Sequence, residues 1–220
     1  MVRAFDRRAR RTIAVSADTT PEEKPLRLFI AISTPEPIKS EISKVQQFLR
    51  ETLAGSRISW SNPEQIHLTL RFLGKVAAAH LPDLVLATRL SAEKFASLNL
   101  CAVGIGCFPN LRRPRVIWVG EQDESKQLLD LQKQIQTATQ PFTSEPADDR
   151  FHPHLTLGRV KEMRAGDAKA LEKQATILQQ KVFGSWQAHE IEIMRSELSP
   201  KGARHTCLAA IPLKSKPDFT

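Results

Sequence analysis

The tetrapeptide His-Leu-Thr-Leu occurs twice in this chain, at residues 67–70 and again at residues 154–157. Each copy lies in a run where apolar and polar side chains alternate, which is the pattern of a β-strand with one buried face. Successive side chains of a strand point to opposite faces, so the leucines of each copy share one face, and the histidine and threonine share the other. Two strands that are distant in the sequence therefore expose the same pair of polar side chains, and the fold must accommodate both strands.

The segments around the two copies are also alike, which predicts one internally duplicated domain with two similar lobes facing each other. Apolar runs predict strands at residues 26–32, 66–74, 98–108, 114–120, 152–160, 185–198 and 203–213. Helical spacing of apolar residues predicts four helices. Two of them span residues 35–51 and 77–96. A third carries Leu128, Leu131, Ile135 and Ala138 on one side, and a fourth carries Ala168, Leu171, Ala175 and Leu178. Strands mixed with helices without strict alternation predict an α+β fold with largely antiparallel sheets.

The ends of the chain differ from its body. We expect residues 1–24, which include RRARR and a run of small polar residues, to form a disordered basic arm. Residues 25–214 should form a single bilobal domain, and residues 215–220 a frayed tail. No apolar run reaches the ~18 residues of a membrane span, and the N-terminus lacks the apolar core of a signal peptide. We therefore expect a cytoplasmic protein with no membrane partner.

The cysteine count and the net charge indicate the redox state of the thiols and the class of binding partner. Three cysteines (Cys101, Cys107 and Cys207) are an odd number with no C-x-x-C spacing, so we expect reduced thiols buried near strands. The net charge of +8 favours anionic partners such as nucleic acid or nucleotides, although charge alone leaves this open. The basic run at 111–115 should lie in a hairpin turn, where it either steers RNA or is simply solvated.

The exposed pair in each motif has a definite chemistry. If the two lobes face each other, His67, Thr69, His154 and Thr156 converge on one cleft. An imidazole has an unperturbed pKa of ~6.5, so one ring can take a proton from water while the other gives a proton to a leaving oxygen. Threonine hydroxyls can donate hydrogen bonds to the non-bridging oxygens of a phosphate. This set needs no metal or other cofactor to open a strained phosphodiester.

The chain resembles the 2H phosphoesterase superfamily, and within it the RNA 2′,3′-cyclic phosphodiesterases, also called 2′-5′ RNA ligases. The resemblance covers roughly residues 26–213, including WSNPEQIHLTLRFLGKV (60–76) and FHPHLTLGRVK (151–161). It implies a bilobal α+β fold: two antiparallel sheets with outer helices in a pseudo-twofold arrangement, and a cleft between the lobes. It also implies hydrolysis of RNA 2′,3′-cyclic phosphate ends to 2′-phosphomonoesters, with His67 as proton donor, His154 as proton acceptor and Arg159 as a substrate-binding residue.

The alternation rule bears on the arginine that follows each motif. Arg159 reaches the cleft only if its strand bulges or ends near Gly158, which a glycine permits. It would then add charge at the phosphate or stack on a base. Arg71 has the same parity problem, and we expect it to be a solvated or RNA-facing charge.

Other residues suggest weaker alternatives. His152, His154 and His67 could in principle form a three-histidine zinc site, but Pro153 and the lack of a partner carboxylate motif argue against one. We expect His80, His189 and His205 to be surface or locally bonded histidines. The large aromatic residues Phe72, Phe108, Phe151 and Trp118 are mainly core candidates, although one of them could stack a base.

Three functions remain open. The first is hydrolysis of RNA 2′,3′-cyclic ends by a monomeric enzyme, with tRNA fragments among the candidate substrates. The second is ATP-independent 2′-5′ RNA ligation through the same site. The third is an RNA-end-binding module without catalysis, which tight binding without turnover would indicate.

Overall fold

The computed structural model describes residues 24–199 and 202–214. In chain order these form β1 (Leu26–Ser33), α1 (Glu36–Thr52), β2 (Arg57–Trp60), η1 (Pro63–Gln65), β3 (His67–Val76), η2 (Ala78–His80), α2 (Leu81–Ala92), β4 (Leu98–Phe108), β5 (Val116–Asp123), α3 (Leu128–Thr139), η3 (Gln140–Phe142), β6 (His154–Glu162), α4 (Ala165–Ile177), β7 (Val182–Ala188), β8 (Glu190–Ser199) and β9 (Gly202–Pro212). The expected arm, apart from Lys24, and the expected tail lie outside the described residues.

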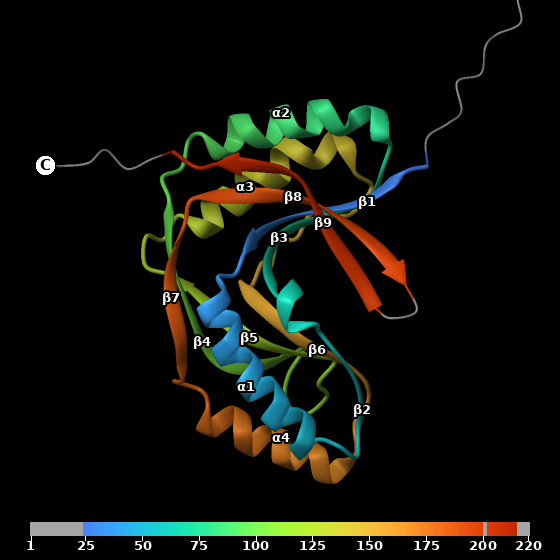
Figure 1. The fold of residues 1–220 in the computed structure, drawn as a ribbon, viewed down its shortest axis with the longest axis vertical. Helices are drawn as coiled ribbons and strands as arrows, with labels where there is room; N and C mark the ends of the chain where they lie inside the picture. The colour runs from blue at the N-terminus through green and yellow to red at the C-terminus, as the bar shows by residue number, and fades with distance from the viewer. Residues whose placement is uncertain (1–23, 200–201, 215–220) are drawn as a thin grey trace, which may run out of the picture.

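One curled antiparallel sheet holds both motif strands. Its order is β7–β4–β5–β6–β3–β1–β8–β9, with β2 paired to β6. The motif strands β3 and β6 are neighbours in the middle of the sheet, and they are joined by a single pair, Leu68 and Leu155. The α+β prediction with two antiparallel sheets is confirmed, with the refinement that the two sheets are halves of one sheet connected at this pair (Figure 1).

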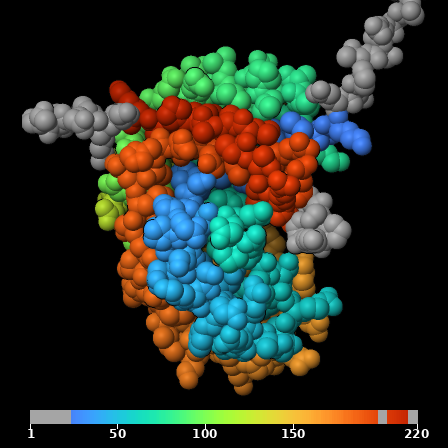
Figure 2. Space-filling model, in the orientation of Figure 1, coloured from blue at the N-terminus to red at the C-terminus, as the bar shows by residue number. Residues whose placement is uncertain are grey.

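Two pairs of helices cover the two halves (Figure 1). Helix α2 packs against α3 and β9, and α3 packs on β3. Helix α1 packs against β7 and α4. The apolar residues of α1 share one face, as helical spacing requires: Ile38, Ile42 and Leu49 are buried, and Val45 is half-buried against the core. In the space-filling view, the orange and red surface of β8 and β9 lies above the blue and cyan surface of α1 and the residues after it (Figure 2).

The prediction of one strand at 185–198 was wrong. The chain changes from one half of the sheet to the other at His189: β7 pairs with β4, whereas β8 pairs with β1 and β9. Alternation could not reveal this change, because both strands are extended and both are half-buried. Residues 57–60, where no strand was predicted, form the short strand β2.

Among the described residues, no helix is both long and apolar enough to cross a membrane. All three cysteines are free thiols and lie on strands. Cys107 is buried and Cys101 is half-buried, but Cys207 is exposed, so the expectation of burial was wrong for Cys207.

Candidate functional site

The four polar residues of the two motifs lie on one face of the sheet. The pair Leu68–Leu155 sets the register of β3 against β6. His67 and Thr69 flank Leu68, and His154 and Thr156 flank Leu155, so the joined pair brings the two motifs together, and the charge of His154 acts on His67. The motif leucines are buried: Leu68, Leu70, Leu155 and Leu157. The polar residues are half-buried: His67, Thr69, His154 and Thr156. The predicted division of faces is therefore confirmed on both strands.

Both imidazoles are oriented by the same local contact. The Nδ1 atom of His67 lies 2.7 Å from the carbonyl oxygen of Gln65, and Nδ1 of His154 lies 2.7 Å from the carbonyl oxygen of His152. A carbonyl can only accept, so Nδ1–H donates in each case and a neutral ring keeps its lone pair on Nε2. The two motifs thus present equivalent rings, each able to take or to give a proton at Nε2.

A third histidine stands beside His67. The rings of His67 and His205 are 5.3 Å apart at 88°, and Phe29 contacts both, stacked on His67 at 4.8 Å and edge-on to His205 at 4.9 Å. The expectation that His205 is a surface or locally bonded residue was wrong. No sequence signal near His205 could have shown this, because β8 and β1 lie between its strand, β9, and β3 in the sheet.

His154 has an aromatic neighbourhood of its own. Phe108 contacts its ring edge-on at 4.9 Å and lies 5.1 Å from the ring of Trp118. Glycine makes room for this indole, because a Cβ at Gly106 would lie only 2.2 Å from Cη2 of Trp118. Phe108 and Trp118, expected mainly in the core, therefore belong to the surroundings of the site.

Burial controls the charge of both motif histidines. It lowers the pKa of His67 to about 4; the hydrogen bond to the Gln65 carbonyl opposes this shift, and the charges of His205, His154 and Lys39 add to it. Burial also lowers the pKa of His154, opposed by the His152 carbonyl and reinforced by the charge of Arg159. Both rings are therefore mainly neutral near pH 7 while the site holds no anion.

The register of β6 changes between its motif and Arg159. Thr156 pairs with Trp118 of β5 but Gly158 pairs with Ile117, so one extra residue is inserted at Leu157. The carbonyl of Leu157 accepts a bond from the backbone N–H of Ser61 at 2.8 Å and another from the side chain of Gln46 at 2.9 Å. The insertion shifts the alternation by one, so Arg159 lies on the same face as Thr156.

Strand β3 has an equivalent irregularity, and the residue that emerges from it is Phe72. Ala31 of β1 pairs with Thr69, whereas Phe29 pairs with Phe72. Phe72 follows His67 by five residues, as Arg159 follows His154, and its side chain is 53% exposed. An exposed aromatic ring and an exposed guanidinium thus occupy corresponding positions in the two halves.

The expectation for Arg71 was wrong, because this side chain is 4% exposed. Its guanidinium donates to the carbonyl oxygens of Glu145, at 2.8 Å, and Pro146. It also donates to the side-chain oxygens of Gln140, at 3.1 Å, and Gln136. The extra residue that turns Phe72 outward turns Arg71 inward, where it holds the loop that leads to β6.

The three-histidine zinc alternative has no geometric support. Within residues 24–199 and 202–214, no three His, Cys, Asp or Glu side chains are placed to hold a metal ion. His152, the third proposed ligand, is exposed.

Comparison with known proteins matches the chain twice to the family described as LigT like phosphoesterase, at residues 32–118 and 119–205. Each match contains one motif copy, which agrees with the predicted internal duplication. RNA 2′,3′-cyclic phosphodiesterases of Methanothermobacter thermautotrophicus and Archaeoglobus fulgidus are each 31% identical to the chain, over 82% and 80% of it and over 95% and 94% of their own lengths.

Solved structures agree with the sequence matches. A protein of Thermus thermophilus superposes with a TM-score of 0.69 at 28% identity, covering 87% of this chain and all of that one. E. coli LigT complexed with 3′-AMP superposes with a TM-score of 0.68 at 25% identity, covering 86% of this chain and 99% of the other. On these matches and the paired motif strands, the chain belongs to the LigT-like phosphoesterase family.

Proposed function

We propose that this protein hydrolyses 2′,3′-cyclic phosphates at RNA ends and leaves a 2′-phosphomonoester. The observation that carries the proposal is the pair of equivalent imidazoles, His67 and His154, each donating from Nδ1 to a backbone carbonyl and lying on one face with two threonines. Relatives that match most of the chain are named RNA 2′,3′-cyclic phosphodiesterases, and a related structure holds 3′-AMP.

The chemistry divides between the two histidines. Nε2 of His154 takes a proton from a water molecule, whose oxygen forms a new bond to phosphorus. The P–O3′ bond breaks, and His67 gives a proton from Nε2 to the departing O3′. Thr69 and Thr156 donate hydrogen bonds to the non-bridging oxygens, where negative charge grows in the transition state.

The electrostatics favour this assignment for His154. The positive charge of Arg159 helps to keep its ring neutral, as a base must be. His67 is neutral as well before substrate binds, so the anionic phosphate has to supply the field that protonates it. A 5′-hydroxyl can take the place of water: His154 removes its proton, O5′ bonds to phosphorus, the P–O3′ bond breaks and His67 protonates O3′. This 2′-5′ ligation through the same two rings is the second candidate.

Arg159 and Phe72 are suited to hold the terminal nucleotide. Both are exposed and emerge from corresponding positions of the two motif strands. A guanidinium can pair with phosphate or lie flat on a base, and an exposed phenyl ring offers a stacking surface that accepts any base.

Substitution of each histidine tests the mechanism. His67→Asn and His154→Asn retain an amide donor for the backbone carbonyl, so folding should survive while turnover of a 2′,3′-cyclic RNA falls by about 10²–10⁴-fold in each variant. His189→Asn, at an exposed residue between β7 and β8, is the matched control and should keep full activity. If either motif histidine can be replaced without a fall in turnover, the two histidines do not act as an acid–base pair.

Product analysis separates the remaining alternatives. Activity with a chelator present and a 2′-phosphate product support metal-independent hydrolysis. If an RNA with a 2′,3′-cyclic end is joined to an RNA with a 5′-hydroxyl faster than the cyclic end is hydrolysed, the result favours ligation. Tight binding of the cyclic end without any turnover would favour a binding module.

A further inference from the structure

Exposed cations continue from the site along one face of β6 and β2. Arg159 pairs with Val116 of β5 and with Ser59 of β2, and paired residues of antiparallel strands point to the same face. Two residues before Ser59, Arg57 returns to that face. Both arginines are exposed, so guanidinium groups follow the motif residues outward from His154.

The β4–β5 turn adds two more cations at the same end of the sheet. Arg112 and Arg113 are exposed, and their backbone N–H groups both donate to the side-chain oxygen of Asn110 at 3.1 Å, which orders the turn. The turn adjoins β6, because the carbonyl of Arg115 accepts from the N–H of Val160 at 2.9 Å. We call Arg57, Arg112 and Arg113, which lie beyond Arg159, together the basic strip.

The charge of the strip is not neutralised within the described part of the chain. There, salt bridges join only Lys44 to Glu41 and Arg195 to Glu197. Glu162 is opposite Arg57 in the strand register but is not bonded to it. These exposed guanidinium groups are therefore free of ion pairs among the described residues.

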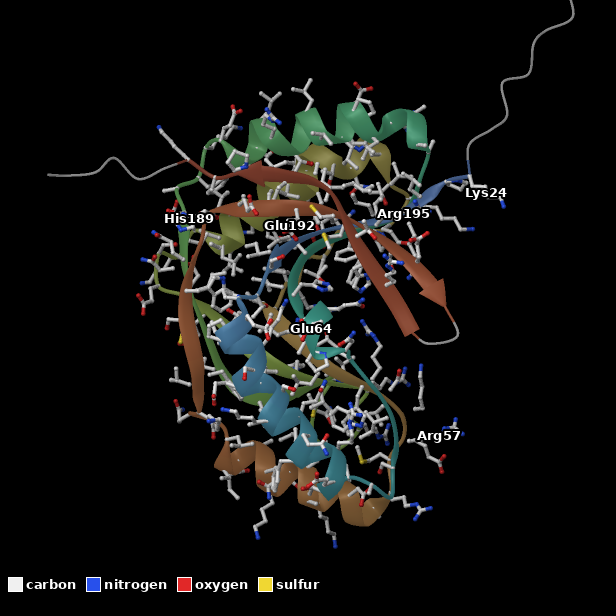
Figure 3. All side chains as sticks on the ribbon, viewed as in Figure 1. Lys24, Arg57, Glu64, His189, Glu192 and Arg195 are labelled. Carbon is white, nitrogen blue, oxygen red and sulfur yellow. The ribbon has the colours of Figure 1, made fainter. Side chains whose placement is uncertain are left out.

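On the other side of the site the charges are mixed. Ser33 pairs with His67 in the register of β1 and β3, and its hydroxyl donates to the carboxylate of Glu192 at 2.6 Å. Glu192 and Glu64 lie near the middle of the molecule in Figure 3, whereas Arg57 lies at its lower right edge. Lys39 lies beside Glu64, donating to its backbone carbonyl at 2.9 Å, and also acts on His67, so this side carries both signs, whereas the basic strip consists of arginines alone.

We propose that the basic strip binds the RNA backbone on the 5′ side of the terminal nucleotide, so that the protein prefers oligonucleotide ends to cyclic mononucleotides. This inference rests on the proposed function. A 2′,3′-cyclic phosphate is the 3′ end of its chain, so the remaining nucleotides can leave only in the 5′ direction, each with one negative charge. Arg159 follows His154 by five strand residues, roughly 15 Å, so only a chain of several nucleotides spans the strip.

The test compares two substrates and two matched triple variants. The strip variant is Arg57→Gln, Arg112→Gln, Arg113→Gln, which leaves Arg159 in place. The control variant removes three exposed cations from other surfaces: Arg89→Gln, Lys94→Gln, Lys173→Gln. The substrates are a nucleoside 2′,3′-cyclic monophosphate and a decamer RNA with a 2′,3′-cyclic end, each assayed over a range of salt concentrations.

We expect kcat/KM for the decamer to fall about tenfold in the strip variant at low salt and to stay unchanged in the control. Each phosphate contact contributes about 0.7 to the salt slope of single-strand binding, so the strip variant should lose about 2 from that slope. Turnover of the mononucleotide should be the same in all three proteins. Equal losses on both substrates, or none on the decamer, would overturn the inference.

The proposed function and the strip can fail separately. If the unsubstituted protein cleaves neither substrate, the proposed function is wrong, and the strip is then judged by fluorescence anisotropy with a labelled decamer ending in a 2′-phosphate. Weaker binding by the strip variant alone supports the strip, and equal binding by all three proteins refutes it.

Discussion

In the free protein the imidazole of His67 is neutral near pH 7, whereas the proposed mechanism needs it charged when O3′ departs. Burial lowers its pKa to about 4, so at pH 6.5 roughly 0.3% of the rings carry a proton. Raising this pKa to about 7 takes roughly 4 kcal/mol, at 1.36 kcal/mol for each pKa unit. A single negative charge 4 Å from the ring provides about 4 kcal/mol at an effective dielectric constant of 20. One bound phosphate is therefore enough to charge His67.

Titration of the histidine ring signals by NMR measures this directly. The pKa of His67 should lie near 4 in the free protein and near 7 with a nucleoside 2′-phosphate bound, and binding at pH 6 should take up a proton from solution. The ring signals of His189, an exposed residue at the left edge of the molecule in Figure 3, should not respond to the ligand. A free-protein pKa close to 6.5 would refute the burial argument. A pKa that stays below 5 with phosphate bound would refute His67 as the proton donor.

Three further substitutions test the packing around the site, and a fourth serves as a comparison. Burial raises the pKa of Glu121 to about 9, and both its carboxyl oxygens lack partners among the described residues. The unfolded carboxyl ionises near pH 4.5, so stability should fall as pH rises from there to about 9, and Glu121→Gln should stabilise by up to about 3 kcal/mol at pH 7. Gly106→Ala pushes a Cβ against Trp118 and should cost about 1–3 kcal/mol, with reduced turnover. Gly166→Ala, the comparison, meets no atom within 4 Å and should stabilise helix α4 by up to about 1 kcal/mol. Arg71→Met removes the bonds that hold the loop before β6 and should cost roughly 2–3 kcal/mol.

Urea unfolding at pH 5 and pH 8 provides the measurements. A gain from Glu121→Gln that is equal at both pH values would show that the carboxyl is ionised in the folded protein. If Gly106→Ala and Gly166→Ala have the same effect, the contact with Trp118 is not tight. Lys75→Met, at an exposed residue of β3, is the control for Arg71→Met, and equal effects would contradict the role of Arg71 in the loop.

The motif residues could be placed from the sequence because their signal is local. Alternation along a strand assigns faces without knowledge of any partner, and the burial of Leu68 and Leu155 against the half-exposed His67 and His154 follows from it. The same rule identified Arg159 as a residue that needs an irregular strand to reach the motif face, and β6 has that irregularity.

The errors arose where partners are distant. His205 reaches His67 only because β9 joins the same half of the sheet as β3. Arg71 is buried rather than solvated because the loop at 140–148 offers carbonyl oxygens to its guanidinium. The predicted strand at 185–198 is divided because its two parts pair in different halves of the sheet. Side-chain periodicity is a property of a single segment, and it was sufficient to find the two motifs. The pairing of strands depends on hydrogen bonds and packing between remote segments, and only the folded chain could bring His205 to His67 and Arg57 to the strand that carries Arg159.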